Sequence, residues 1–204
     1  MIIRFLLTYS SVYDIMYIIE RRNVFMTQET KDRMSEVIRS FRMPRFDEIP
    51  NVGLYLEQVT KYISDCLSPL EDVNITGSMI SNYVKRGLVE NPVKKQYSRT
   101  QIAYLIYIAV TKNALSLDNI RILIDMQKRT HEAKAAYDYF CSELENIIFY
   151  VFGLKDFVDS ANGDNSDEKM LLRNTVIAVA HQTYLNMCLN AIQNEHNEHT
   201  PTED

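Results

Sequence analysis

The segment from Ile75 to Met126 constrains the fold of this chain more than any other part of the sequence. Its first residues predict a short helix, because Thr76 can cap the helix at its start and Gly87 can end it. Leu88–Tyr97, with the sequence LVENPVKKQY, then predicts two very short strands around a turn. Two amphipathic helices follow, and the first opens with a Ser-x-x-Gln capping box.

This order of elements is that of a winged helix-turn-helix, which places one helix in a DNA groove and a hairpin on the DNA backbone. In the first predicted helix, Ile80, Tyr83 and Val84 are expected to face inward. The opposite face is a polar stripe of short side chains with a basic end, formed by Ser78, Ser81, Asn82 and Lys85 and followed by Arg86. Short polar side chains allow close approach to phosphates and base edges, so we expect this face to contact DNA. The alternative is an ordinary surface helix with small polar residues.

The charge of the same segment differs from that of the whole chain. The chain has a net charge of −5, yet residues 75–112 carry six basic residues and one acid, which gives +5 locally and −10 elsewhere. A basic surface on an acidic body can steer a polyanion to one place. We therefore expect Lys94, Lys95 and Arg99 to hold phosphates, while a solvated basic hairpin without a partner is the alternative.

The sequence shows no signature of catalysis, of a cofactor or of a metal site. It contains no Gly-rich phosphate loop, no paired metal ligands and no nucleophile motif, so we expect a protein that is not an enzyme. Cys66, Cys141 and Cys188 are far apart in sequence and are predicted to be buried free thiols in a reducing compartment. His196 and His199 belong to a polar C-terminal tail that is expected to fray.

Hydrophobic periodicity and the small number of glycines and prolines, five of each, predict an all-α fold with a small two-stranded wing. Further helices are expected over residues 30–41, 52–67, 130–152 and 167–193, with a connector between Pro44 and Pro50 and a loop over residues 160–166. The last two helices have more apolar surface than a lone hairpin can hide, so they are expected to pack on the rest of the chain, on each other or on a second subunit. In the last helix, the residues expected to face inward include Leu171, Leu172, Val176, Val179, Ala180, Leu185 and Leu189.

Four parts are predicted along the chain. They are a hydrophobic extension (1–25), a DNA-binding domain (26–126), a helical dimerisation or effector region (127–194) and a disordered tail (195–204). Three interpretations of the extension stay open: an upstream addition from a misassigned start before Met26, an amphipathic helix packed on the body or a partner, and a membrane anchor.

Three fragments resemble MerR-type regulators. ISNYVKRGLV resembles their second helix and the turn after it, QYSRTQIAYL their Tyr-Ser and third helix, and LSLDNIRILI a later Leu-rich segment. Two features depart from that family: Ser81 and Asn82 stand where it usually has Arg-Tyr, and the wing with Lys94, Lys95 and Tyr97 is shorter. The resemblance therefore implies DNA binding, whereas metal or drug sensing is not implied because no cysteine cluster follows.

A longer stretch, from about Pro44 to Met126, resembles a bacterial family known as domain of unknown function 1836. The fragments that carry it are PRFDEIPNVGLYLEQVTKYI and MISNYVKRGLVENPVKKQYSRTQIAYLI. This resemblance implies a cytoplasmic bacterial transcriptional regulator with a MerR-like region. We expect it to bind double-stranded DNA as a homodimer, without a metal or a membrane partner. The alternative function is a helical protein-interaction adaptor on the same scaffold.

Overall fold

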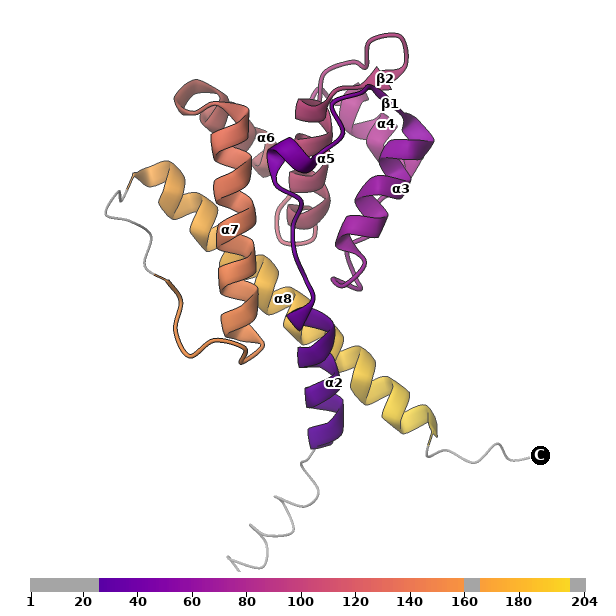
Figure 1. Cartoon of the computed structure of the whole chain (residues 1–204), viewed down its shortest axis with the longest axis vertical. Helices are drawn as coiled ribbons and strands as arrows, with labels where there is room; N and C mark the ends of the chain where they lie inside the picture. The colour runs from indigo at the N-terminus through magenta and orange to yellow at the C-terminus, as the bar shows by residue number, and fades with distance from the viewer. Residues whose placement is uncertain (1–25, 160–165, 199–204) are drawn as a thin grey trace, which may run out of the picture.

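The structure is a computed structural model that describes residues 26–159 and 166–198, with side chains described up to residue 194. The described chain is mainly helical with one small antiparallel sheet, as the sequence predicts (Figure 1). In chain order its elements are α2 (Gln28–Arg39), η1 (Phe46–Glu48), β1 (Leu54–Tyr55), α3 (Leu56–Leu67), α4 (Gly77–Lys85), β2 (Gln96–Tyr97), α5 (Arg99–Thr111), α6 (Leu117–Thr130), α7 (Ala133–Val151) and α8 (Asp167–Glu198). The last helix is longer than the predicted 167–193, because α8 continues to Glu198 into the predicted tail. The predictions for residues 1–25 and 199–204 lie outside the described residues, as does most of the 160–166 loop.

The small sheet differs from the wing that the sequence predicts. Both strands were expected within Leu88–Tyr97, but β2 pairs with β1, which lies about forty residues earlier in the chain. Leu54 is opposite Tyr97 and Tyr55 is opposite Gln96. Within the predicted hairpin only one bridge forms, between Val93 and Gln96. The ladder therefore depends on long-range pairing, which local turn signals do not report.

The start of α3 is also later than predicted. Residues 52–67 were expected to form one helix, but Leu54 and Tyr55 are extended in β1 and the helix begins at Leu56. The backbone N–H of Tyr55, the residue before the helix, donates to the side-chain oxygen of Gln58 in the first turn at 2.9 Å. This bond caps the start of the helix. Pairing with β2 supplies the backbone partners that keep the first residues out of the helix.

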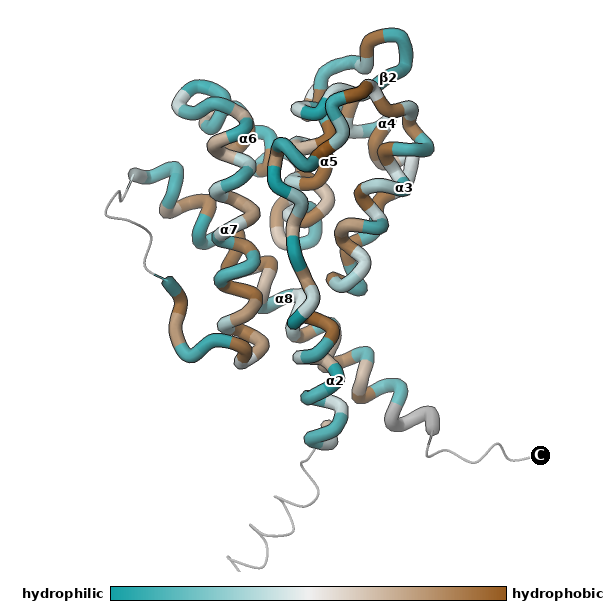
Figure 2. The backbone as a smooth tube through the Cα atoms, viewed as in Figure 1, coloured by the Kyte–Doolittle hydropathy of each residue, from teal (hydrophilic) through white to brown (hydrophobic). Residues whose placement is uncertain are grey.

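Helix α5 lies at the centre of the molecule. It packs against η1, α3, α6, α7 and α8, and nine of its 13 residues are buried. Its apolar side chains belong to one hydrophobic cluster that also includes Ile38 of α2, Ile63 of α3 and Leu144 of α7. Figure 2 shows apolar colour on the sides of the helices that face this centre.

The predicted 130–152 helix is shorter than expected because α6 continues to Thr130. His131 is extended, with φ −141° and ψ 147°, and α7 starts at Ala133. Gly153, with φ 70°, stands just past the end of α7, where the sequence placed the helix end.

Helix α8 packs along α7, as one of the open alternatives predicted. Val176, Val179 and Ala180 are buried as expected. The same expectation was wrong for three leucines of α8, because Leu171, Leu185 and Leu189 are exposed. Their apolar character is thus not explained by packing among the residues that the structure describes. None of the helices in residues 26–159 and 166–198 is long and apolar enough to cross a membrane.

Candidate nucleic-acid interface

The ends of α4 form as the sequence predicts. The Thr76 hydroxyl accepts a hydrogen bond from the Met79 N–H at 3.3 Å, and so caps the first turn. At the other end, Gly87 has φ 73° and donates from its N–H to the Val84 carbonyl, while the Leu88 N–H donates to the Tyr83 carbonyl, both at 2.9 Å. These two bonds are a Schellman motif, which fixes the direction in which the chain enters the wing.

Helix α4 is held against α3 by one face. Ile80 and Tyr83 are buried, and Val84 is half-buried. Gly77 lies so close to α3 that a Cβ there would stand 3.3 Å from a methyl carbon of Leu56. This close approach leaves the other face of α4 directed to solvent.

The polar stripe is on that exposed face, and all four of its residues are exposed. The two serines make local bonds: the Ser81 hydroxyl donates to the Gly77 carbonyl at 2.8 Å, and the Ser78 hydroxyl pairs with that of Thr76 at 2.9 Å. The exposed side chains of Asn82 and Lys85 are therefore the stripe's freest groups for an external ligand. An amide can pair in two ways with adenine, and an ammonium can contact a phosphate.

The turn of the wing has an unusual backbone. Lys94 has φ 51° and Lys95 has φ 64°, and they are the non-glycine residues with positive φ in the described chain. Two-way backbone hydrogen bonds between Val93 and Gln96, at 3.1 and 2.9 Å, close the turn around them. Two consecutive left-handed residues form a type I′ turn, which favours Asn-Gly and costs about 1–2 kcal/mol for each residue with a Cβ. The fold thus holds two exposed lysines at the tip despite an unfavourable backbone.

The side chain of Gln101 in α5 holds the wing, here residues 88–97, against α5. Its side-chain N–H group donates to the carbonyls of Glu90 and Asn91 at 2.9 and 3.2 Å, while its carbonyl oxygen accepts from the Ser98 N–H at 2.8 Å. Gly53 approaches the other side so closely that a Cβ would stand 2.8 Å from the Cβ of Gln96. Both contacts restrict the orientation of the wing relative to α5.

The basic residues of the segment 75–112 divide into three that bond to other residues of the protein and three exposed lysines. Arg86 pairs with Asp118 at 2.9 Å, and Arg99 pairs with Asp47 at 3.2 Å and donates to the Ile49 carbonyl at 2.8 Å. Lys112 donates to the carbonyl and side chain of Asn74, and burial lowers its pKa. In the part of the chain that the structure describes, Lys85, Lys94 and Lys95 have no ion pair and are exposed.

Two of the predicted DNA contacts are turned toward the protein. Tyr97 is buried in β2, and Arg99 is only half-exposed, with its guanidinium over the ring of Phe46. Neither side chain reaches outward from the wing. The outward-facing members of the predicted set are Ser78, Ser81, Asn82, Lys85, Lys94 and Lys95, with the ion-paired Arg86 next to them.

Three exposed apolar residues near the wing were not predicted from the sequence. Val93 stands beside the lysine turn and is 74% exposed, and Val52 and Tyr55, around β1, are 70% and 53% exposed. Tyr55 is opposite Gln96, so β1 brings it next to the wing. The pattern of residues 52–67 predicts one amphipathic helix and no strand, so no local signal placed Tyr55 here.

No group of three or more His, Cys, Asp or Glu side chains that could hold a metal ion occurs among the described residues. The three cysteines are free thiols; Cys141 is buried, whereas Cys66 and Cys188 are half-buried. Burial raises the pKa of the Cys141 thiol to about 12, so this group stays protonated at neutral pH.

Figure 1 places α4, the wing and the β1–β2 sheet together at one end of the molecule, opposite α2 and the end of α8. None of the curated proteins and none of the solved structures matches this chain. A family match covers the elements from η1 to α6 and the first part of α7, and it includes residues 44–126, where the sequence fragments indicated the family. Residues 44–140 match the model of the family described as domain of unknown function DUF1836.

Proposed function

We propose that this chain is a DNA-binding transcriptional regulator with a MerR-like winged helix-turn-helix, in which α4 enters the major groove. The observation that carries the proposal is the pairing of two exposed features at one end of the molecule. One is the polar stripe of α4, and the other is the tight turn that presents Lys94 and Lys95. In this arrangement the helix supplies base contacts and the turn supplies phosphate contacts.

The order of the elements supports the same function. A strand precedes α3, α4 follows a short connection, and the chain then returns through the lysine turn to pair with that strand. A winged helix-turn-helix uses this order to keep its wing beside its groove helix. The proposal includes no catalytic step and no cofactor.

We propose further that the protein acts as a homodimer through α8. Leu185 and Leu189 lie one helical turn apart and are 58% and 55% exposed, and Leu171 is exposed on the same helix. Exposed apolar side chains in such a row mark interaction surfaces.

Sedimentation equilibrium tests the dimer. The wild type should be dimeric, and the double variant Leu185→Ser/Leu189→Ser should be monomeric. Ile122→Ser on α6, also 58% exposed, should not.

The second candidate function is a protein-interaction adaptor without DNA binding. The observation that favours it is the group of exposed apolar side chains of Val52, Tyr55 and Val93 around the wing. A phosphate-binding wing needs cations and not apolar surface, so these residues would belong to a protein contact. DNA binding through phosphate contacts should weaken as the salt concentration rises, whereas an adaptor of this kind would bind no DNA even at low salt.

The test is binding to random duplex DNA over a range of salt concentrations. Replacing Lys94 and Lys95 by Ala should weaken binding to every sequence alike and lower the slope of log affinity against log salt by about one to two units, since each phosphate contact contributes about 0.9. The double variant Lys31→Ala/Arg129→Ala makes the same change of charge away from the wing and should keep the slope. A wild-type protein that binds no DNA at low salt would move the adaptor function to first place.

A further inference from the structure

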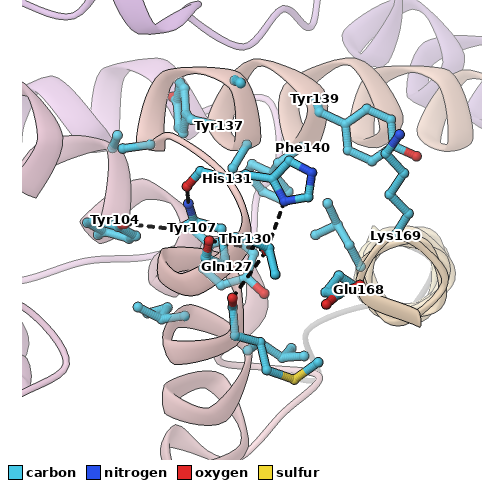
Figure 3. A pocket seen from close by; sticks show the side chains of 18 residues that line it. Tyr104, Tyr107, Gln127, Thr130, His131, Tyr137, Tyr139, Phe140, Glu168 and Lys169 are labelled. Atoms are coloured by element: carbon cyan, nitrogen blue, oxygen red, sulfur yellow. Dashed lines mark hydrogen bonds between the residues drawn. The ribbon is translucent and has the colours of Figure 1, made fainter. Parts of the chain in front are cut away.

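A pocket lies between α5, α6, α7 and the start of α8 (Figure 3). Its volume is about 290 Å³, and its walls are mainly apolar and aromatic. The rings of Tyr107 and Phe140 meet edge to face at 5.0 Å in this wall. Aromatic side chains around a pocket of this kind favour a flat apolar ligand.

The size of the pocket limits the size of the ligand. A protein cavity of about 150 Å³ lined by apolar side chains holds one benzene molecule. The present pocket has about twice that volume, so two fused aromatic rings fit it better than one ring or a larger molecule.

Part of the wall is already fixed by hydrogen bonds. The Tyr104 hydroxyl donates to the side-chain carbonyl of Gln127 at 2.9 Å, and the Gln127 amide donates to the His131 carbonyl at 2.8 Å. These bonds join α5, α6 and the start of the connection to α7. The wall they form is therefore preformed, and binding does not have to order it.

Glu168 is the polar group that distinguishes the pocket. Its carboxylate points into the pocket from the first turn of α8 (Figure 3), and no hydrogen bond or ion pair joins it to any of the residues that the structure describes. A carboxylate accepts hydrogen bonds and has none to donate. A ligand that satisfies Glu168 must therefore carry a donor such as a ring N–H.

Helix α6 connects this pocket to the candidate DNA-binding helix. Its last turns line the pocket through Met126, Gln127 and Thr130. At its other end, Arg121 donates to the Arg86 carbonyl at the end of α4, and Asp118 pairs with the Arg86 guanidinium at 2.9 Å. A ligand that shifts α6 would therefore act on the end of α4.

We infer that the pocket binds a molecule of about two fused aromatic rings with one hydrogen-bond donor directed at Glu168, and that its occupancy changes the affinity of the protein for DNA. The second half of this inference rests on the proposed function, and the first half does not. The pocket has a preformed aromatic wall for the rings and an acceptor for the donor. The coupling runs through α6, which touches both sites.

Indole is a suitable probe because this chain contains no tryptophan, so indole fluorescence can be excited without a background from the same fluorophore. Titration of the full chain with indole should give saturable binding at one site. Ala136→Phe places a ring in the pocket and should abolish binding while circular dichroism stays unchanged. Absence of saturable binding to the wild type, or full binding by a folded Ala136→Phe protein, overturns the inference.

The role of Glu168 has its own test, which does not depend on folding of a core variant. Glu168→Met should weaken indole binding by about tenfold, as expected for loss of a hydrogen bond to a charged acceptor. It should leave the binding of 1-methylindole unchanged, because this probe has no donor. Glu132→Met makes the same change at an exposed position outside the pocket and should affect neither probe. Equal weakening of both probes by Glu168→Met would overturn the assignment of the donor.

Duplex DNA binding measured with and without saturating indole tests the coupling. The affinity should change by at least about fivefold, the lower end of typical allosteric coupling. If indole binds and DNA binds but neither affects the other, the coupling is wrong. If indole binds and no DNA does, the proposed function fails, while the assignment of the pocket stands.

Discussion

Helices α4 and α5 differ in what surrounds them, although both begin with a hydroxyl N-cap, from Thr76 and Ser98. Nine of the 13 residues of α5 are buried, and five other elements pack against it. Only two of the nine residues of α4, Ile80 and Tyr83, are buried, and α4 packs mainly on α3. We therefore expect α5 to contribute most to stability, whereas the side chains that can meet a ligand lie on α4.

This division has a physical reason. A helix that is apolar on all sides must lie inside the protein, because each exposed face would leave apolar surface in water. A helix with one buried face gives up part of that stabilisation and keeps its polar face available. Variants on the two helices should therefore separate loss of folding from loss of binding.

The largest effect is expected for a cavity in α5. Leu105 is fully buried, and Leu105→Ala should lower the free energy of unfolding by about 2–5 kcal/mol through lost burial and a residual cavity. Urea unfolding followed by circular dichroism measures this. Ile122→Ala on α6 removes an apolar side chain that is 58% exposed and should cost less than about 1 kcal/mol. Equal costs for the two variants would show that α5 is not the centre of stability.

A smaller effect, on binding alone, is expected for the exposed face of α4. Asn82→Ala should cost about 1–3 kcal/mol at one base position of a selected DNA site and little on random DNA. Its free energy of unfolding should stay within about 0.5 kcal/mol of the wild type, since the residue is exposed. Genome-wide selection of bound DNA followed by affinity measurements tests this. Unchanged base preference would show that α4 does not read DNA.

The smallest effect is expected at the end of α4. Gly87 has φ 73°, and a Cβ there would meet no atom within 4 Å, so Gly87→Ala should cost about 1–2 kcal/mol from backbone strain alone. Gly153→Ala at the end of α7 has the same geometry, with φ 70° and equally open space. The two variants should lose similar stability in thermal unfolding, but only Gly87→Ala should also weaken DNA binding. A similar loss of DNA binding in both would contradict a role for the α4 terminus.

The ends of the helices were predicted better than the pairing of the two strands. Thr76 and Ser98 cap the helices they were expected to cap, and Gly87 and Gly153 follow the ends of theirs. A cap acts within three or four residues, so its signal is complete in a short stretch of sequence. The pairing of β1 with β2 joins residues about forty positions apart, and two-residue strands have no periodicity that could predict it.

Burial was predicted well where one helix face is apolar and poorly where a helix is long. The faces of α4 separate as expected, with Ile80 and Tyr83 inside and the polar stripe outside. On α8, Leu171, Leu185 and Leu189 have the character of core residues but lie exposed. The hydrophobicity of a side chain predicts that the side chain favours burial, but it does not predict which surface will cover it.

The mainly helical fold, the caps, the two faces of α4 and the local charge of +5 in residues 75–112 follow from the sequence alone, because each of these depends on neighbours in the chain. Which of those charges are paired depends instead on how the helices pack. The tertiary structure pairs Arg86 with Asp118 and Arg99 with Asp47, and it leaves Lys85, Lys94 and Lys95 exposed. An ion pair requires two charged groups within about 4 Å, and for residues about 30 or 50 positions apart that distance is set by packing.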